Sequence, residues 1–298
     1  MSALPRLLIV GAAGQVGTEL LRSFRDFGDI TAADRKSVNL AVADETRDLV
    51  RRIAPDIILN AAAYTAVDRA ESEPEIAMAI NALAPHVLAE EAKALGALLV
   101  HYSTDYVFDG EKNGPWSEVD EPNPQNAYGA SKLAGERAIL EVGGKHLIFR
   151  TSWVYSAHGS NFLLTMLRLA RQRDSISVVD DQFGAPTTAA ELANATRTIV
   201  QGVMSGRLGG PEDWAGLYHM TCLGSTTWCG FARGIFDRAG KLLDGKVPII
   251  TPIPSKDYPV PAKRPRNSVL SNAKLQSQFN LQLAPWETAL DAVMQELK

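Results

Sequence analysis

A glycine-rich segment near the start of the chain constrains the fold more than any other feature. An apolar run leads directly into the sequence GAAGQVG (residues 11–17), and an amphipathic stretch over residues 18–27 follows. This order predicts a buried strand, a turn and a helix, the context of a dinucleotide-binding fingerprint with the spacing Gly-x-x-Gly-x-x-Gly. Gly11 would allow the tight turn, Gly14 a close approach of pyrophosphate, and Gly17 close packing of the helix. The helix N-terminus would offer free N–H groups to phosphate. A plain glycine-rich turn is the alternative.

The residues after the second apolar run bear on the choice of dinucleotide. That run ends in Asp34, whose carboxylate can accept the ribose hydroxyls of NAD. Arg35 and Lys36 follow, and either cation could instead hold the 2′-phosphate of NADP. The sequence therefore leaves NADH and NADPH open. We expect Asn39 and Leu40 to form a short strand end that lines the adenine pocket.

Apolar strands alternate with helical patterns through the first half of the chain. This alternation predicts an α/β fold of the Rossmann type, a doubly wound parallel sheet covered by helices on both faces. We expect residues 1–150 to form mainly the dinucleotide-binding domain. Residues 151–298 should form mainly a smaller C-terminal α/β substrate-binding lobe, with part of that chain returning to the first domain. The strands expected in the first domain cover residues 7–10, 30–33, 56–59, 97–108 and 145–150.

A tyrosine and a lysine four residues apart are the candidate catalytic pair. Tyr128 and Lys132 open a segment rich in Ala, Leu, Glu and Arg, so a helix would place both on one face. A nearby ammonium favours the phenolate, and we expect it to lower the pKa of Tyr128. Such a tyrosine can exchange a proton with a carbonyl or alcohol oxygen. The hydroxyls of Ser103 and Thr104 should end a preceding strand, at the edge of the sheet where active sites of this fold class lie. Exposed, solvated side chains are the alternative.

The proline-rich segment 255–267 carries a small cluster of cations. Lys263, Arg264 and Arg266 stand close together in a chain whose formal net charge is −4. Loop charges usually serve solvation, but arginines also bind diphosphate well. We expect Arg264 to make such a contact.

Charge and hydropathy exclude several kinds of partner. With a net charge of −4 and no long basic run, the chain is not expected to bind nucleic acid. It has no apolar stretch long enough to cross a bilayer and no signal-peptide layout at its start. Cys222 and Cys229 are expected to be reduced thiols, and the predicted location is the cytoplasm.

Several segments together resemble the extended short-chain dehydrogenase/reductases and, within them, the dTDP-4-dehydrorhamnose reductase family. The resemblance covers essentially the whole chain. It implies reduction of the 4-keto group of dTDP-4-dehydro-β-L-rhamnose by NADPH or NADH. The segments are the glycine turn, NAAAYTAVDRAESE (60–73), HYSTDYVFDG (101–110), YGASKLAGE (128–136), FRTSWVY (149–155), DQFGAPT (181–187) and RPRNSVL (264–270).

The resemblance also implies roles for individual residues. Tyr128 would donate the proton, Lys132 would bind the nicotinamide ribose and acidify Tyr128, and Thr104 would hydrogen-bond the reacting oxygen. The residues expected to contact the cofactor are Gly11, Gly14, Gln15, Val16, Gly17, Asp34, Arg35, Asn39, Leu40, Ala62, Ala63, Thr65, Tyr128 and Lys132. Those expected to contact the dTDP-sugar are Val67, Thr104, Asp105, Tyr106, Trp153 and Arg264.

Some relatives of this kind form homodimers around Mg²⁺ held by carboxylates. Here Glu296 matches one such ligand, whereas the other falls near Ala190, with Glu191 beside it. This departure puts a metal-linked dimer in doubt, so bound Mg²⁺ and a homodimer both stay open, and no metal-ligating residue is assigned. Two other functions stay open: a ketoreductase or epimerase for another nucleotide sugar, and a regulatory subunit that keeps the dinucleotide fold without turnover.

Overall fold

The computed structural model describes residues 4–298, and its central feature is a six-stranded parallel sheet. The strand order is β10-β5-β4-β3-β1-β2, so β2 lies on one side of β1 and β3 on the other. That reversal between β2 and β3 is the switch point at which open α/β sheets bind ligands. The strands are β1 (Arg6–Val10), β2 (Asp29–Ala33), β3 (Ile57–Asn60), β4 (Leu98–Thr104), β5 (His146–Thr151) and β10 (Gly216–His219).

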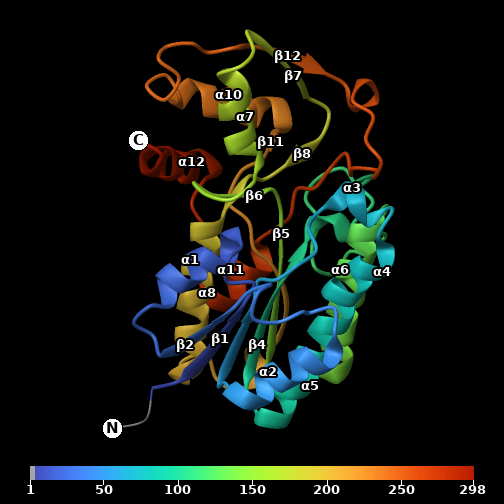
Figure 1. Ribbon diagram of the computed structural model, residues 1–298, viewed down its shortest axis with the longest axis vertical. Helices are drawn as coiled ribbons and strands as arrows, with labels where there is room; N and C mark the ends of the chain where they lie inside the picture. Colours follow the sequence, from blue (N-terminus) through green and yellow to red (C-terminus); the bar gives the residue numbers. More distant parts are fainter. Residues whose placement is uncertain (1–3) are drawn as a thin grey trace.

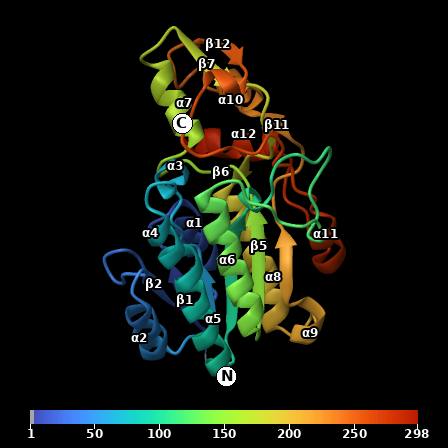
Figure 2. The same ribbon diagram turned by 90° about the vertical axis from the view of Figure 1, so that its right-hand side faces the viewer.

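Helices cover both faces of this sheet, as the alternating pattern predicts (Figures 1 and 2). Leu7 and Ile9 of β1 belong to the hydrophobic cluster on the face of α1 and α8, whereas Leu8 and Val10 belong to the cluster on the face of α2 and α5. A strand buried on both faces reads as a continuous apolar run, which explains the sequence of β1. The covering helices are α1 (Gln15–Phe24), α2 (Ala43–Ile53), α5 (Ala84–Leu95), α6 (Ala127–Val142) and α8 (Ala189–Met204).

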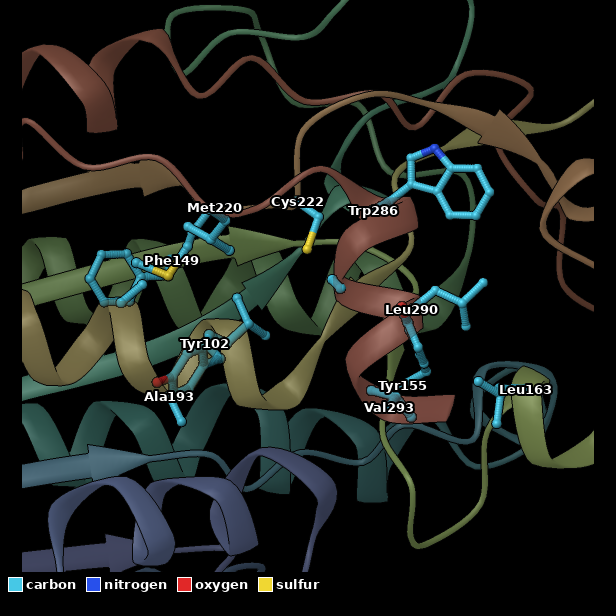
Figure 3. Close-up of a cluster of buried hydrophobic side chains, with 14 of the residues drawn as sticks. Tyr102, Phe149, Tyr155, Leu163, Ala193, Met220, Cys222, Trp286, Leu290 and Val293 are labelled. Carbon is cyan, nitrogen blue, oxygen red and sulfur yellow. The ribbon is translucent and has the colours of Figure 1, made fainter. Parts of the chain in front are cut away.

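A smaller part of the molecule lies beyond one end of the sheet, at the top of Figures 1 and 2. It is built from α7, α10, α12 and short strands, among which β7 pairs with β12 and β8 with β11. Figure 3 shows Trp286, Leu290 and Val293 of α12 among the buried side chains, with Cys222 nearby. The elements are α7 (Phe162–Ala170), β6 (Val154–Tyr155), β7 (Ser175–Val179), β8 (Phe183–Gly184), β9 (Thr187–Thr188), β11 (Thr226–Thr227), α10 (Trp228–Arg238), β12 (Ile249–Ile253), η3 (Ser255–Asp257) and α12 (Trp286–Glu296).

Several expected elements differ from those observed. The strand expected over 97–108 ends at Thr104, because the Thr104 hydroxyl accepts the N–H of Tyr106 and begins the 3₁₀ turn η2 (Asp105–Val107). The short strand expected at 39–40 is a turn in the described chain, held where Asn39 accepts the N–H of Ala41. Further elements are α3 (Val67–Ala70), α4 (Pro74–Met78), the π-helical turn η1 (Ala79–Leu83), α9 (Pro211–Trp214) and α11 (Ala273–Phe279).

Both cysteines are free and buried, as expected for reduced thiols. Burial raises the pKa of Cys222 to about 12, so its thiol stays protonated near neutral pH. Within the described residues, no helix combines the length and apolarity needed to cross a bilayer.

Candidate active site

The glycine turn has the geometry that a phosphate-binding site requires. Gly11 has a φ of +80°, and a Cβ there would lie 2.6 Å from the Ala62 backbone nitrogen. A Cβ at Gly17 would lie 2.1 Å from the Gly11 carbonyl oxygen, so Gly17 lets α1 pack against the turn itself. At Gly14 a Cβ would meet only that oxygen, at 3.2 Å, and in the described chain no side chain caps this end of α1. The first N–H groups of α1 therefore suit a pyrophosphate.

Replacement of Gly17 by alanine tests this packing. We expect Gly17→Ala to lower the free energy of unfolding by about 1–3 kcal/mol, because the added methyl group would overlap backbone atoms. NADPH binding should weaken with it, since the turn must shift. The matched control is Gly240→Ala, where no described atom beyond the adjoining residues lies within 4 Å of the new Cβ. Urea denaturation and NADPH titration measure both effects, and equal stability of the two variants would contradict the assignment.

The second strand brings Asp34 to the same edge of the sheet. Val10 pairs with Ala33, and the Ala33 carbonyl accepts the N–H groups of Gly11 and Ala12. The Asp34 carboxylate accepts the N–H groups of Lys36 and Ser37, which orders the turn that carries the exposed Arg35. Leu40 packs against the buried cluster behind this turn.

The remaining residues expected to bind the cofactor surround the turn. The half-exposed Ala62 and Ala63 follow β3 beside Gly11, and Thr65 is exposed just beyond them. Gln15 instead uses its side-chain oxygen to accept hydrogen bonds from Ser156 and Asn161, at 2.9 and 2.7 Å. Val16 packs against the main hydrophobic cluster. Gln15 and Val16 could therefore contact a cofactor chiefly through backbone.

Helix α6 carries Tyr128 and Lys132 in its first two turns, as predicted. Its N-cap is Asn126, whose side-chain oxygen accepts the N–H of Gly129 at 2.8 Å and whose amide donates to the Lys263 carbonyl at 2.9 Å. Asn126 thus ties the start of the helix to the segment before Arg264. An Asn directly before a helical sequence is a recognisable capping signal.

The expected lowering of the Tyr128 pKa is wrong for this structure. Burial raises the pKa of Tyr128 to about 12, the nearby Asp105 also raises it, and the hydroxyl of Thr104 lowers it. The cause lies in where Lys132 points. Its side-chain nitrogen Nζ donates to the Tyr102 carbonyl at 2.7 Å, and no hydrogen bond joins it to Tyr128 within residues 4–298. The Thr104 hydroxyl, by contrast, lies close enough to Tyr128 to lower its pKa.

Three of the residues expected to bind substrate surround this pair of hydroxyls. Tyr106 lies edge-on to Tyr128, with ring centroids 5.7 Å apart, and the Arg264 guanidinium lies 5.8 Å from the Tyr106 ring. Arg264 donates to Asp68 at 2.8 Å. Asp105 accepts from Thr104 at 3.0 Å, and burial raises its pKa to about 6. Within the described residues, Oδ2 of Asp105 and Nη1 of Arg264 are buried without a hydrogen-bond partner, so both are available to a ligand.

The other expected substrate contacts are Val67, at the start of α3, and Trp153. Trp153 has a φ of +48° and stacks on Trp228, with ring centroids 3.6 Å apart and planes 8° from parallel. A Cβ at Gly184 would lie 2.4 Å from the Trp153 ring, so Gly184 makes room for it. The positioning of Trp153 by Trp228 and Gly184 could not be predicted from the sequence, because it depends on contacts between distant segments.

Some polar residues serve the scaffold instead. Ser103 donates to Glu136, which also binds Arg150, so Ser103 does not share the role expected of Thr104. Asn81, at the π-helical turn, accepts the N–H of Tyr64 at 2.8 Å and donates to Ser131 at 3.0 Å. Asn81 thus connects the segment after β3 to α6.

The carboxylates that correspond to the Mg²⁺ ligands of some relatives are engaged in hydrogen bonds within this chain. Glu296 accepts a hydrogen bond from Arg22 at 2.7 Å, and Glu191 accepts the backbone N–H of Ala284 at 2.9 Å. Among residues 4–298, no three His, Cys, Asp or Glu side chains gather closely enough to hold a metal ion.

Known proteins match this chain over nearly its whole length. It is 46% identical to a dTDP-4-dehydrorhamnose reductase of Burkholderia thailandensis over 296 residues, 98% of this chain and 99% of the relative. It is 44% identical to that of Escherichia coli K12, over 98% of this chain and 97% of the relative. The crystal structure of the Bacillus anthracis dTDP-4-dehydrorhamnose reductase in complex with NADP superposes with a TM-score of 0.89 at 35% identity, over 98% of this chain and 99% of that one. The family described as RmlD substrate binding domain matches residues 5–298. The chain therefore belongs to the RmlD substrate binding domain family.

Proposed function

We propose that this chain is a dTDP-4-dehydrorhamnose reductase, which uses NADPH to reduce the 4-keto group of dTDP-4-dehydro-β-L-rhamnose to dTDP-L-rhamnose. The relatives of that name and the NADP complex support the reaction and the cofactor. The observation that carries the proposal is the meeting of the Thr104 and Tyr128 hydroxyls at the sheet edge where the glycine turn also lies.

The proton chemistry belongs to Tyr128. Bound NADPH supplies the hydride for C4 of the sugar. Tyr128 is protonated at neutral pH, because burial raises its pKa to about 12, so it holds the proton that the developing alkoxide requires. Thr104 is placed to hydrogen-bond the same oxygen, which would stabilise its negative charge.

Orientation of the two substrates falls to the surrounding residues. The glycine turn and the N-terminus of α1 would bind the pyrophosphate, and Lys132 the nicotinamide ribose. Within residues 4–298, Oδ2 of Asp105 and Nη1 of Arg264 have no hydrogen-bond partner, which suits contacts with a sugar hydroxyl and with the diphosphate, respectively. Trp153 would supply an apolar face for the sugar ring.

A cofactor-oxidation assay tests the proposal. We expect steady NADPH oxidation with dTDP-4-dehydro-β-L-rhamnose and no partner protein, and dTDP-L-rhamnose as the product. A panel of other nucleotide ketosugars should give lower kcat/KM. Interconversion of sugars without net loss of NADPH would identify an epimerase, and absence of turnover despite NADPH binding would favour the regulatory subunit.

We further propose that the enzyme acts in the cytoplasm, a reducing compartment that suits the two free cysteines. We also assign residues 1–150 mainly to dinucleotide binding and residues 151–298 mainly to the substrate lobe. Strand β10 belongs to the six-stranded sheet and α8 packs on it, which supports the return of part of residues 151–298 to the dinucleotide-binding domain.

A further inference from the structure

His101 is a buried histidine for which the proposed reaction has no role. It lies in β4, its side chain is inaccessible to solvent, and its two ring nitrogens face two other buried groups. Nδ1 lies 2.9 Å from the amide nitrogen of Asn60, and Nε2 lies 3.2 Å from Nζ of Lys132. The protonation of each ring nitrogen must therefore match the donor or acceptor that faces it, the Asn60 amide on one side and the Lys132 side chain on the other.

The orientation of the Asn60 amide determines which ring nitrogen carries the proton. The backbone N–H of Ala62 donates to Oδ1 of Asn60 at 3.2 Å, so the Asn60 amide nitrogen is the atom that faces His101. That nitrogen is a donor, and Nδ1 must therefore accept. Burial, together with Lys132, lowers the pKa of His101 well below its ordinary value, so the ring is neutral. Its single proton then belongs on Nε2, facing Lys132.

An Nε2–H group and a lysine ammonium cannot satisfy each other. The ammonium has three N–H donors and no acceptor, whereas a neutral amine can accept from Nε2 while it donates to the Tyr102 carbonyl at 2.7 Å. The ammonium is accommodated only if the ring proton moves to Nδ1. Asn60 must then turn its oxygen toward the ring, which removes that oxygen from the N–H of Ala62.

We propose that His101 is a positioning residue that acts through Lys132. It couples the protonation of Lys132 to the orientation of the Asn60 amide, and so to the hydrogen bond that Asn60 accepts from the N–H of Ala62. Ala62 contacts the glycine turn, since a Cβ on Gly11 would lie 2.6 Å from its nitrogen. Dinucleotide binding between Lys132 and this turn is therefore linked to proton uptake through His101. This consequence, unlike the tautomer exchange itself, depends on the proposed function.

The charged groups around Lys132 permit a titration near neutral pH. Burial lowers the pKa of Lys132 to about 8, and Glu136 of the same helix raises it. Arg150 of β5 donates two hydrogen bonds to Glu136, at 2.9 and 2.6 Å. Asp105 of η2 raises the pKa of Tyr128 through its charge. Within residues 4–298, His101 is the titratable side chain from β4 that hydrogen-bonds to Lys132. The ammonium form is lost as the pH rises through about 8.

Nitrogen-15 NMR of histidine-labelled protein tests the tautomer exchange without any cofactor. Across pH 6–10 we expect a neutral His101 that changes from the Nδ1–H to the Nε2–H tautomer as Lys132 loses its proton. His101→Gln identifies the signal by its loss. In Lys132→Met the ring should keep the Nε2–H tautomer at every pH, because the Asn60 donor remains. A single tautomer in the wild type throughout this range would overturn the proposal.

NADPH titration across the same pH range tests the link to binding. We expect wild-type affinity to fall about tenfold per pH unit above the Lys132 pKa, and the fall to begin about one unit higher in His101→Gln, whose side-chain oxygen can accept from the ammonium. His219→Gln is the matched control, a buried histidine that bonds to the Trp116 carbonyl. An unshifted fall in a folded His101→Gln would overturn the link. A wild type that exchanges tautomers but does not bind NADPH would contradict the proposed function instead.

Discussion

Replacement of Tyr128 by phenylalanine is expected to lower kcat by roughly 10²–10⁴-fold, because the variant lacks the proton donor for the developing alkoxide. The ring would remain packed edge-on against Tyr106, so the fold and NADPH affinity should change little. Single-turnover measurement of NADPH oxidation with saturating ketosugar would isolate the chemical step from product release. The same loss should appear in kcat/KM, since the interaction belongs to the transition state.

A second tyrosine provides the control for that experiment. Tyr218 is buried in β10, and its hydroxyl donates to the Trp214 carbonyl at 2.8 Å, within a different hydrogen-bond network. Tyr218→Phe should lose some stability, about 1 kcal/mol for one hydrogen bond, while its kcat stays near the wild-type value. Near-normal turnover in Tyr128→Phe, or equal losses in the two variants, would exclude Tyr128 as the proton donor.

Replacement of Arg150 by methionine should produce the largest loss of stability. Arg150 donates to both carboxylate oxygens of Glu136, at 2.9 and 2.6 Å, and the side chains are 4% and 1% exposed. Loss of the arginine leaves a buried carboxylate with Ser103 as its hydrogen-bonding partner. We expect the free energy of unfolding to fall by about 3–5 kcal/mol in urea denaturation.

An exposed ion pair and a double variant show whether burial is the cause. Arg6 and Asp56 lie 3.7 Å apart with side chains 51% and 46% exposed, so Arg6→Met should cost less than about 1 kcal/mol. Replacing both Arg150 and Glu136 by methionine should recover much of the loss, because no unpaired charge remains. An Arg150→Met variant as stable as Arg6→Met would contradict this explanation.

The elements that could be predicted are those whose local sequence agrees with their tertiary surroundings. The apolar runs of β1 and β3 and the amphipathic α2 are examples, since burial on one or both faces leaves a clear periodicity. Between α4 and α5 the chain does not form one continuous α-helix, because the π-helical turn η1 interrupts it. No local pattern announces the π-helical turn, which brings Asn81 to Tyr64 and Ser131. The helix α11 leaves only a weak pattern in the sequence, because it is a short segment that packs against β10.

The candidate site divides in the same way. Tyr128, Lys132 and Thr104 could be found because their side-chain chemistry and their place at a helix start or strand end are local properties. The direction of the Lys132 side chain could not be found in this way, and the expected lowering of the Tyr128 pKa was therefore wrong. Its nearest acceptor is a carbonyl of β4, thirty residues away in sequence. The stack of Trp153 on Trp228 likewise joins segments that only the fold brings together.

The sequence by itself determined the parallel sheet, the glycine turn and the identity of the reacting side chains, because hydrophobic periodicity and short-range spacing specify these. Only the tertiary structure decided the protonation of those side chains and the partners that orient them. A pKa depends on burial and on charges from every neighbouring element, and a hydrogen bond depends on atoms that distant segments bring within about 3 Å. Both are properties of the assembled interior, which no single segment contains.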